Sequence, residues 1–309
     1  MYRYIAKRLL MLLFVALGIS FMIYFVMDLA PGDPAVLALG EGASDEEYEA
    51  YRIEMELDKP VAYRYIKYMG NLLRGDLGYS RRFQMDVMEL YMRRLPASLL
   101  LALSATIVST LLSIPLGVYT ALHRGTLRDN AVSALSVAGM AAPGFWMGLM
   151  LIILFALKLN WFNSGGFASP LDVVLPAVTI GIENMARTTR TTRSSMIDVL
   201  SQDYLMLARA KGVKEKKVIT KHALKNALIP IITVAGIQFT SALGGSVVVE
   251  SVFSWPGVGR LVIDAIKSQD VEVVTSSIIM TSVITSAILL VIDLLYAFVD
   301  PRIKAQYSK

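Results

Sequence analysis

Long apolar runs recur along this chain, and they restrict its fold more than any other feature of the sequence. The first run extends from residue 9 to residue 27 and has no charged side chain before Asp28. A helix of about 20 apolar residues crosses the roughly 30 Å hydrocarbon core of a bilayer. The whole chain is 55% hydrophobic with a mean hydropathy of +0.55, which exceeds that of an ordinary soluble domain. The sequence therefore predicts an all-α integral membrane protein.

We predict six membrane-spanning helices, the first within residues 1–29 and the others at 98–122, 131–157, 173–185, 228–249 and 277–299. The 173–185 segment is short and contains Glu183. If it did not cross, the basic residues that follow would lie outside, against the preference of Lys and Arg for cytoplasmic segments. We therefore count this segment as a span that neighbouring helices shield from lipid. Six crossings then place both termini in the cytoplasm. We expect Glu183 and Arg187 to form an ion pair rather than a substrate contact. Pro115 and Pro143 should kink or unwind their spans.

The region 30–97, between the first two spans, is too long for a structureless connection and is expected to form a helical extracytoplasmic part. Ser44 followed by Glu47 predicts a capped helix that ends near Leu57. Pro60 opens a second helix, and Gly75 ends it. The remaining residues, 98–309, form a core of five spans.

A polar and basic segment, 203–227, separates the fourth and fifth spans. Its composition predicts a helix from Asp203, a break at Gly212 and a second helix that approaches Pro230. Tyr204, Leu207 and Ala208 form an apolar stripe at i, i+3 and i+4. Such a helix suits docking into a groove of a partner protein, or attraction to anionic lipid, and the residues alone leave both open.

Several classes of function are excluded by what the sequence lacks. It contains no Cys and only His123 and His222, both in predicted cytoplasmic segments, so we expect no catalytic residue and no metal site. It has no phosphate-binding loop of the G-x-x-x-x-G-K-[ST] type, so any ATP must bind another chain. The net charge of +5 comes from basic residues beside apolar spans, which is typical of membrane topology and not of nucleic-acid binding.

Several short strings carry a resemblance to a known family. The order Ala208, Ala210, Gly212 and then Asn226, Ala227, Ile229, Pro230 resembles the coupling motif of membrane subunits in ATP-binding-cassette importers. Other strings are similar to landmarks of the first permease subunit of the dipeptide, oligopeptide and nickel branch: Pro31-Gly32-Asp33-Pro34, Leu57-Asp58-Lys59-Pro60, Gly75 to Ser80, Phe253 to Gly259, Val291 to Ala297, and Asp300-Pro301-Arg302. Two departures are the missing Asn before residue 291 and Asp270-Val271-Glu272 in place of Asp-Tyr-Pro.

The resemblance implies a type I importer permease fold in a bacterial or archaeal cytoplasmic membrane. It also implies partners: a homologous second permease, two ATPase subunits that bind ATP and Mg, and an extracytoplasmic substrate-binding protein. This chain would bind no cofactor and form half of a path for di- and oligopeptides. The family's ATPase-coupling positions match Asp203, Tyr204, Leu207, Ala208, Arg209, Ala210, Lys211 and Gly212, and its receptor-facing string contains Phe253, Trp255 and Pro256.

Polar and small residues inside the last two spans are candidates for the translocation path, namely Gln238, Gly244, Gly245, Thr281 and Thr285, although close packing and interhelical hydrogen bonds are more ordinary roles. Asp293 is expected to be structural. Within the family, nickel or other metal chelates and glutathione are alternative substrates. From a different class, a secondary transporter or channel is the alternative, and a structural membrane scaffold is another.

Overall fold

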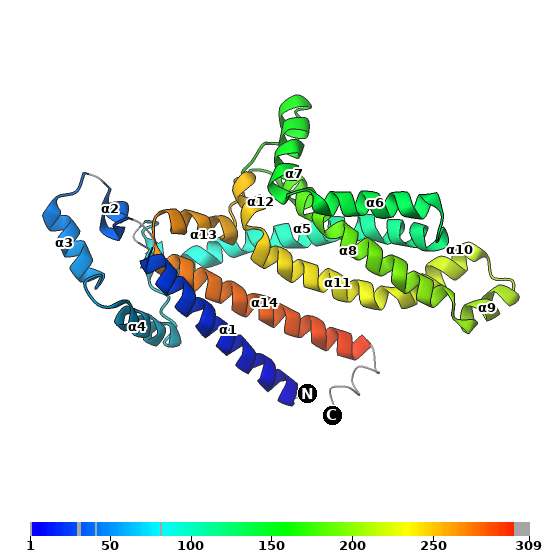
Figure 1. Ribbon diagram of the computed structural model, residues 1–309, viewed down its shortest axis with the longest axis horizontal. Coiled ribbons are helices and arrows are strands. Elements are labelled where there is room, and N and C mark those ends of the chain that lie inside the picture. Colours follow the sequence, from blue (N-terminus) through cyan, green and yellow to red (C-terminus); the bar gives the residue numbers. More distant parts are fainter. Residues whose placement is uncertain (1, 30–31, 41, 81, 300–309) are drawn as a thin grey trace. The chain divides into compact units, whose positions relative to one another are not determined.

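The computed structural model describes residues 2–29, 32–40, 42–80 and 82–299, and most of them are helical (Figure 1). The chain divides into two compact units. The first comprises residues 1–98 and 256–287, and the second comprises residues 99–255 and 288–309. The side chain of Asp293 and the Asp300-Pro301-Arg302 string lie outside the described residues.

The first unit combines the N-terminal helix with the segment predicted to lie outside the membrane. It also contains the first parts of two long helices, α5 (Val87–Leu122) and α14 (Val271–Val299). Its other elements are α1 (Tyr2–Asp28), α2 (Pro34–Leu39), α3 (Asp45–Glu54), α4 (Val61–Leu73), the antiparallel pair β1 (Tyr79–Ser80) and β2 (Met85–Asp86), and α13 (Val258–Lys267).

Local sequence rules account for the helices of this outer segment. Ser44 and Glu47 form the predicted capping box at the start of α3. Pro60 is the N-cap of α4, and Gly75, at φ +84°, follows its end in the left-handed conformation that Gly adopts without strain. Tyr65 and Met69 of α4 pack on a cluster that includes Tyr68 and the α1 residue Tyr24. The expected helices of this segment are present.

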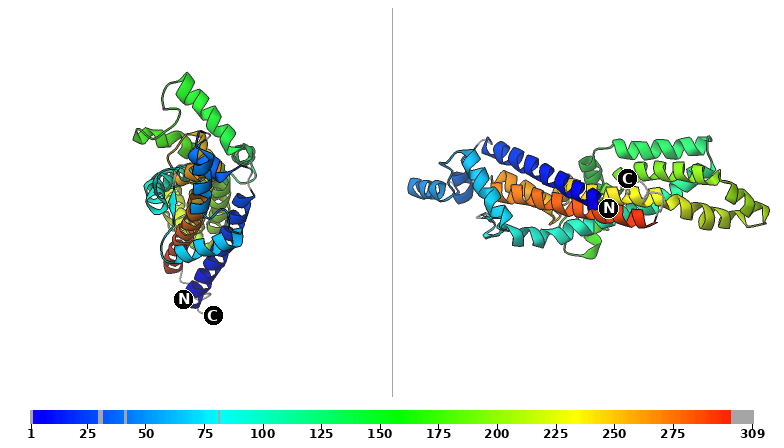
Figure 2. Two further views of the ribbon diagram at one scale, coloured as in Figure 1. Left: turned by 90° about the vertical axis from the view of Figure 1, so that its left-hand side faces the viewer. Right: turned by 90° about the horizontal axis from the view of Figure 1, so that it is seen from below.

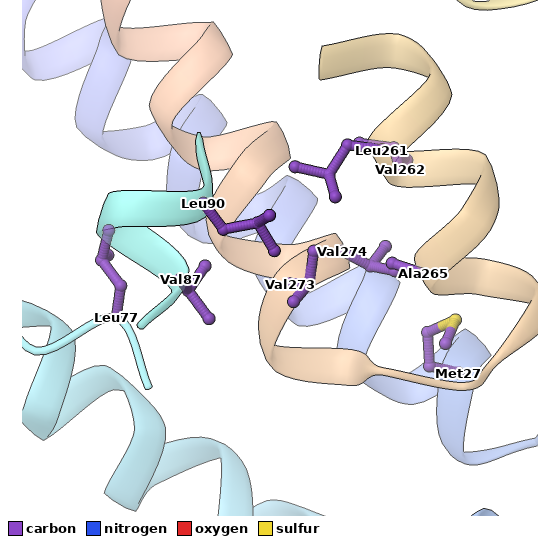
Figure 3. Packing of buried hydrophobic residues seen from close by; sticks show 9 residues of the cluster. All are labelled: Met27, Leu77, Val87, Leu90, Leu261, Val262, Ala265, Val273 and Val274. Atoms are coloured by element: carbon purple, nitrogen blue, oxygen red, sulfur yellow. The ribbon is translucent and has the colours of Figure 1, made fainter. Parts of the chain in front are cut away.

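The core of the first unit is an apolar cluster to which distant segments contribute (Figure 3). It joins the end of α1, the loop before β1, the start of α5, α13 and the start of α14. Fully burying one such Leu or Val side chain stabilises a fold by about 1.5–3 kcal/mol. The members are Met27, Leu77, Val87, Leu90, Leu261, Val262, Ala265, Val273 and Val274.

The second unit is a helical bundle around a long central helix, α8 (Val174–Leu200). The later part of α5 and the end of α14 belong to it as well. Its other elements are α6 (Leu127–Ala141), α7 (Gly144–Leu151), the π-helix η1 (Ile152–Lys158), the 3-10 helix η2 (Pro170–Val173), α9 (Asp203–Ala210), α10 (Glu215–Lys217), the π-helix η3 (Val218–Ala223), α11 (Leu224–Gly245) and α12 (Val247–Val252).

Helix α8 packs along both α6 and α11, and α6 runs beside α8 in the views of Figures 1 and 2. Small residues permit its close approach to α5. A Cβ added at Gly117 of α5 would lie 2.4 Å from the Cβ of Thr192, and one added at Gly181 of α8 would lie 2.8 Å from Cγ1 of Val108. Close helix packing at small residues is a common way to hold membrane helices together.

The two prolines predicted to disturb helices behave differently. The third apolar stretch breaks between α6 and α7, beside Pro143 and Gly144, and the two halves are bent by 98°. Helix α5 instead runs without interruption through Pro115. The predicted kink or unwinding is therefore confirmed as a break at Pro143, whereas at Pro115 the helix is not broken.

Three described helices are long and apolar enough to cross a bilayer: α5, the continuous helix Glu215–Gly245, and α14 up to Ile292. The bent pair Leu127–Ala141 and Gly144–Lys158 makes a fourth if it counts as one span. Helix α8 extends to Leu200, beyond the predicted fourth span at 173–185. It carries too many charged residues to count among these apolar helices. The count of six spans stays a prediction.

Candidate functional site

The polar segment after α8 folds into a short helix and a tight turn. Helix α9 spans Asp203–Ala210, and Gly212 follows at φ +77°. The Gly212 amide donates to the carbonyl of Arg209 (2.9 Å), and the Val213 amide donates to that of Ala208 (3.2 Å). These bonds satisfy carbonyl groups that a helix end leaves free, in a conformation that favours Gly. The predicted helix, break and second helix are all present, and the second helix continues through η3 into α11.

One buried side chain and two polar contacts hold α9 against the rest of the second unit. Leu205 is fully buried in a cluster with Ala121, Met196, Val218, Ala223 and Ala227, called the Leu205 cluster below. The Asn226 side chain donates to the Tyr204 hydroxyl (2.8 Å), which joins α9 to α11. Arg209 pairs with Glu215 across the turn (2.9 Å). The exposed ion pair contributes little free energy, so Leu205 is the main anchor.

The outer side of α9 presents large apolar side chains. Tyr204, Met206 and Leu207 are 44%, 68% and 56% exposed. These three side chains form the docking face. Sequence reasoning placed Ala208 in this stripe, but Ala208 is half-buried and packs on the Leu205 cluster. The sequence pattern did not single out Met206, because apolar spacing does not show which side of so short a helix meets the core. A role of Ala208 at the partner contact stays a prediction.

Gln238, a candidate for the translocation path, joins two helices instead. It is fully buried; its side-chain oxygen accepts a hydrogen bond from Thr188, and its side-chain nitrogen donates to the carbonyl of Asn184, both at 2.9 Å. Both partners lie on α8. Removing one partner of a buried hydrogen bond leaves the other unsatisfied, which is costly. Gln238 therefore fixes the register of α11 against α8.

The other path candidates remain predictions. Gly244 and Gly245 are exposed, with nothing within 4 Å of an added Cβ. Thr281 shares a hydrogen bond with the Tyr91 hydroxyl (3.0 Å), and the Thr285 hydroxyl donates to the carbonyl of Thr281 (2.6 Å). Both threonines are half-buried. Their contacts are of the ordinary helix-packing kind.

The aromatic string predicted to face a receptor is mostly buried. Trp255 is 0% exposed and Phe253 is 2% exposed. The Trp255 ring lies against Phe167, with 4.6 Å between ring centroids, and the Phe253 carbonyl accepts a hydrogen bond from Gly166. These two side chains form part of the unit's core. That the string faces a receptor stays a prediction. Pro256 is half-buried.

An ion pair that sequence reasoning missed joins α6 to α8. Arg193 donates to both carboxylate oxygens of Asp129, with its Nε at 2.8 Å and an Nη at 2.7 Å. Asp129 is buried and also accepts from the Gly125 amide. No ion pair between Glu183 and Arg187 exists among the described residues, so that prediction is wrong. The described residues also hold no group of three or more His, Asp or Glu side chains placed to bind a metal ion.

Two family models together match nearly the whole chain. The model described as "Binding-protein-dependent transport system inner membrane component" matches residues 113–305, and its N-terminal counterpart matches residues 1–102. The first match includes α8, α9 and α11, and thus the whole docking face.

Curated relatives match along their full length. The chain is 41% identical to the oligopeptide transport system permease protein AppB of Bacillus subtilis (strain 168), covering 97% of this chain and 99% of AppB. It is 36% identical to the glutathione transport system permease protein GsiC of Escherichia coli O6:H1 (98% and 99% covered). It is 34% identical to the dipeptide transport system permease protein DppB of Escherichia coli K12 (98% and 99% covered).

A solved structure shares the fold. An inward-facing crystal structure of the MetNI methionine ABC transporter contains a chain that superposes with a TM-score of 0.58 at 18% identity, covering 69% of this chain and 97% of that one. At this identity the likeness concerns the fold alone.

Proposed function

The chain belongs to the family of binding-protein-dependent transport system inner membrane components, and from this premise we propose that it is the permease subunit of an ATP-driven importer of di- and oligopeptides. Relatives along its full length are permeases of oligopeptide, dipeptide and glutathione transport systems. It is a multi-pass inner membrane protein and is not catalytic by itself. The predicted membership of the peptide-permease family is thereby confirmed.

The observation that carries the coupling role is the docking face of α9. A helix this short is marginal without tertiary contacts, yet Leu205 and the Asn226–Tyr204 hydrogen bond fix it in place. Three large apolar side chains then remain exposed on its outer side. A rigid helix with an unpartnered apolar face suits a hydrophobic groove on another protein. The partner is an ATPase subunit, with Asp203, Arg209, Ala210, Lys211 and Gly212 around the contact.

The mechanism follows from how α9 is attached. Closure of two ATPase subunits, which would bind the ATP and Mg, displaces α9. Because Leu205 and Asn226 connect α9 to the bundle, the displacement is transmitted to α8 and α11, and the bundle changes between inward-open and outward-open states. A homologous second permease completes the path, and an extracytoplasmic binding protein supplies the peptide.

Cross-linking tests this proposal directly, since the chain contains no Cys. A single Cys in place of Leu207 is combined with single Cys positions around the groove of each ATPase subunit in the assembled importer. We expect a disulfide whose yield changes with ATP. A single Cys in place of Lys221, exposed on η3, is the matched control and should give none. The same vesicles are assayed for dipeptide uptake with and without ATP.

Three outcomes would contradict parts of the proposal. Uptake that needs no ATP favours a secondary transporter or channel. Labelling of the thiol at position 207 by a lipid-soluble photoreagent, without any cross-link to an ATPase, favours attachment to lipid. Uptake of glutathione but not of other peptides would narrow the substrate to that tripeptide, in line with the glutathione permease relative.

A further inference from the structure

Helix α8 carries charged side chains on a face that the second unit leaves uncovered. Glu183, Arg187 and Arg190 are all exposed and follow one another at i, i+4 and i+7. Residues at these spacings lie along one side of a helix. These three residues form the charged stripe of α8. The opposite side is buried against α6 and α11 through small and apolar residues, and α5 approaches it closely at Gly181.

Two hydrogen bonds fix the depth of this stripe relative to apolar spans. The side chain of Gln238, on α11, donates to the carbonyl of Asn184 (2.9 Å), and that of Ser113, on α5, donates to the carbonyl of Met185 (3.0 Å). Gln238 and Ser113 lie well inside helices that are long and apolar enough to cross a bilayer. The turn from Glu183 to Arg187 is therefore level with the interior of both spans.

Charges at this depth need a polar environment. A charged side chain that faces the bilayer centre costs several kcal/mol, so such residues face water-filled cavities or other protein. Within the described part of the chain, no ion pair and no side-chain hydrogen bond involves Glu183, Arg187 or Arg190. Glu183 also lies beside the break before α7: a Cβ added at Gly144 would come within 3.3 Å of its Oε2.

We propose that the charged stripe of α8 lines the translocation path and binds the two charged ends of the peptide. Glu183 receives the ammonium group, and Arg187 receives the carboxylate. Arg187 can donate two parallel hydrogen bonds to that carboxylate. This inference rests on the proposed peptide import. It adds which residues of the permease bind the peptide and which groups of the peptide they recognise.

The spacing of the stripe fits the proposed ligand. Four helical residues advance about 6 Å along the axis. The charged ends of an extended dipeptide are roughly 6 Å apart, because its Cα atoms are separated by about 3.8 Å and each end adds one further bond. Arg190 lies about 10.5 Å from Glu183 along the axis, which suits the next longer peptide. A solute with charge of only one sign would meet repulsion from one end of the stripe.

Thiol accessibility provides the first test. With a single Cys at position 183 in the complete importer, we expect a charged, water-soluble methanethiosulfonate reagent to react. We expect a free dipeptide with ATP present to slow that reaction, because Arg187 still receives its carboxylate, whereas the same dipeptide with an amidated carboxyl end should not. A single Cys in place of Leu111, an exposed apolar position of α5, is the control and should react slowly under both conditions.

Uptake with altered peptide ends provides the second test. The readout is the uptake of a free dipeptide relative to that of the same dipeptide with an acetylated amino group. Loss of a charged contact changes this ratio by about tenfold, so Glu183→Gln should lower the ratio by that factor. Glu183→Asp retains the carboxylate and should keep a ratio close to that of the wild type. The binding protein is the same in every sample, so a change in the ratio arises in the permease. Asp198→Asn, which alters an exposed carboxylate on the same helix, should leave it unchanged.

The outcomes separate this inference from the proposed function. If the wild-type importer takes up peptides but Glu183→Gln keeps the wild-type ratio, the inference is wrong and peptide import stands. If the thiol at position 183 does not react and Glu183→Gln reduces the amount of assembled importer, Glu183 forms an ion pair with the second permease and the inference is overturned. If the wild type takes up no peptide, the proposed function itself fails.

Discussion

Gly212 shows how one backbone angle separates α9 from the helix that follows. At φ +77° it occupies the left-handed region, and nothing lies within 4 Å of an added Cβ. A side chain there would meet no steric clash with the surroundings, so any penalty comes from the backbone alone. For a residue with a Cβ, the left-handed conformation costs roughly 1–2 kcal/mol, and more for a β-branched one.

We therefore expect Gly212→Val to lower ATP-dependent dipeptide uptake at least several-fold while the yield of the purified permease stays unchanged. The change strains the turn that orients the docking face but touches no core residue. Gly212→Asn is the matched control, because Asn tolerates the left-handed region, and it should retain most uptake. Equal uptake by the Val variant and the wild type would refute this role for Gly212.

Gln238 is a polar side chain whose hydrogen-bond partners lie on another helix, so its role depends on tertiary contacts and not on its own backbone. Its hydrogen bonds to Thr188 and Asn184 explain why a glutamine is present inside an apolar span. In the sequence the same glutamine is also compatible with a solvated path, although helix packing is the more ordinary role. The choice between these roles depends on residues 50 and 54 positions away.

Helix α9 combines two faces with different roles. Leu205 anchors the helix in the bundle, Ala208 packs beside that anchor, and Met206 and Leu207 point outward. A charged substitution should therefore have different consequences on the two sides.

We expect Leu207→Glu to leave the thermal stability of the permease unchanged and to abolish copurification of the ATPase subunits. Ala208→Glu should instead destabilise the permease by about 1–3 kcal/mol, because it brings a carboxylate against an apolar cluster. Thermal unfolding in detergent and ATPase yield after affinity purification measure the two effects. Normal ATPase binding by the Leu207 variant would remove the docking face from the mechanism.

The Asp129–Arg193 ion pair links two elements, α6 and α8, two turns before α8 leads into α9. Asp129 is buried and Arg193 is partly exposed, so part of the interaction is screened by solvent.

A double-mutant cycle with Asp129→Asn and Arg193→Gln should give a coupling energy of about 1–2 kcal/mol for unfolding. Each single variant should also reduce uptake, since α6 would no longer follow α8. Arg190→Gln, which removes an exposed guanidinium from the same helix, should leave the stability unchanged. A coupling energy near zero would mean that the pair is not structural.

At the scale of the whole molecule, each unit contains a part with its own predicted location. The first includes the capped and turn-rich helices between α1 and α5, whereas the second contains α8 and the docking face. The predicted orientation places those outer helices outside the cell and the docking face in the cytoplasm.

Single-Cys labelling of intact cells tests this orientation. A single Cys in place of Glu46, exposed on α3, should react with a membrane-impermeant maleimide. A single Cys in place of Met206, exposed on α9, should react only after the cells are permeabilised. The wild type, which has no Cys, is the control for background labelling. The reverse pattern would invert the topology and exclude α9 as a contact for a cytoplasmic ATPase.

The sequence by itself determined the features that depend on neighbouring residues. Apolar runs predicted membrane helices, Ser44 and Glu47 predicted the start of α3, and Gly212 predicted the end of α9. The family strings predicted a peptide permease. Each rests on interactions within a few residues of chain, or on short motifs, and can be recognised without knowing the fold.

Only the tertiary structure decided which side chains those helices bury and which they expose. It placed Trp255 in the core, turned Leu205 inward and Met206 outward, and paired Asp129 with Arg193 across 64 positions. It also left Glu183 without the expected Arg187 partner. The physical reason is that burial and charge pairing depend on contacts between distant segments, and helical spacing restricts those contacts without selecting them.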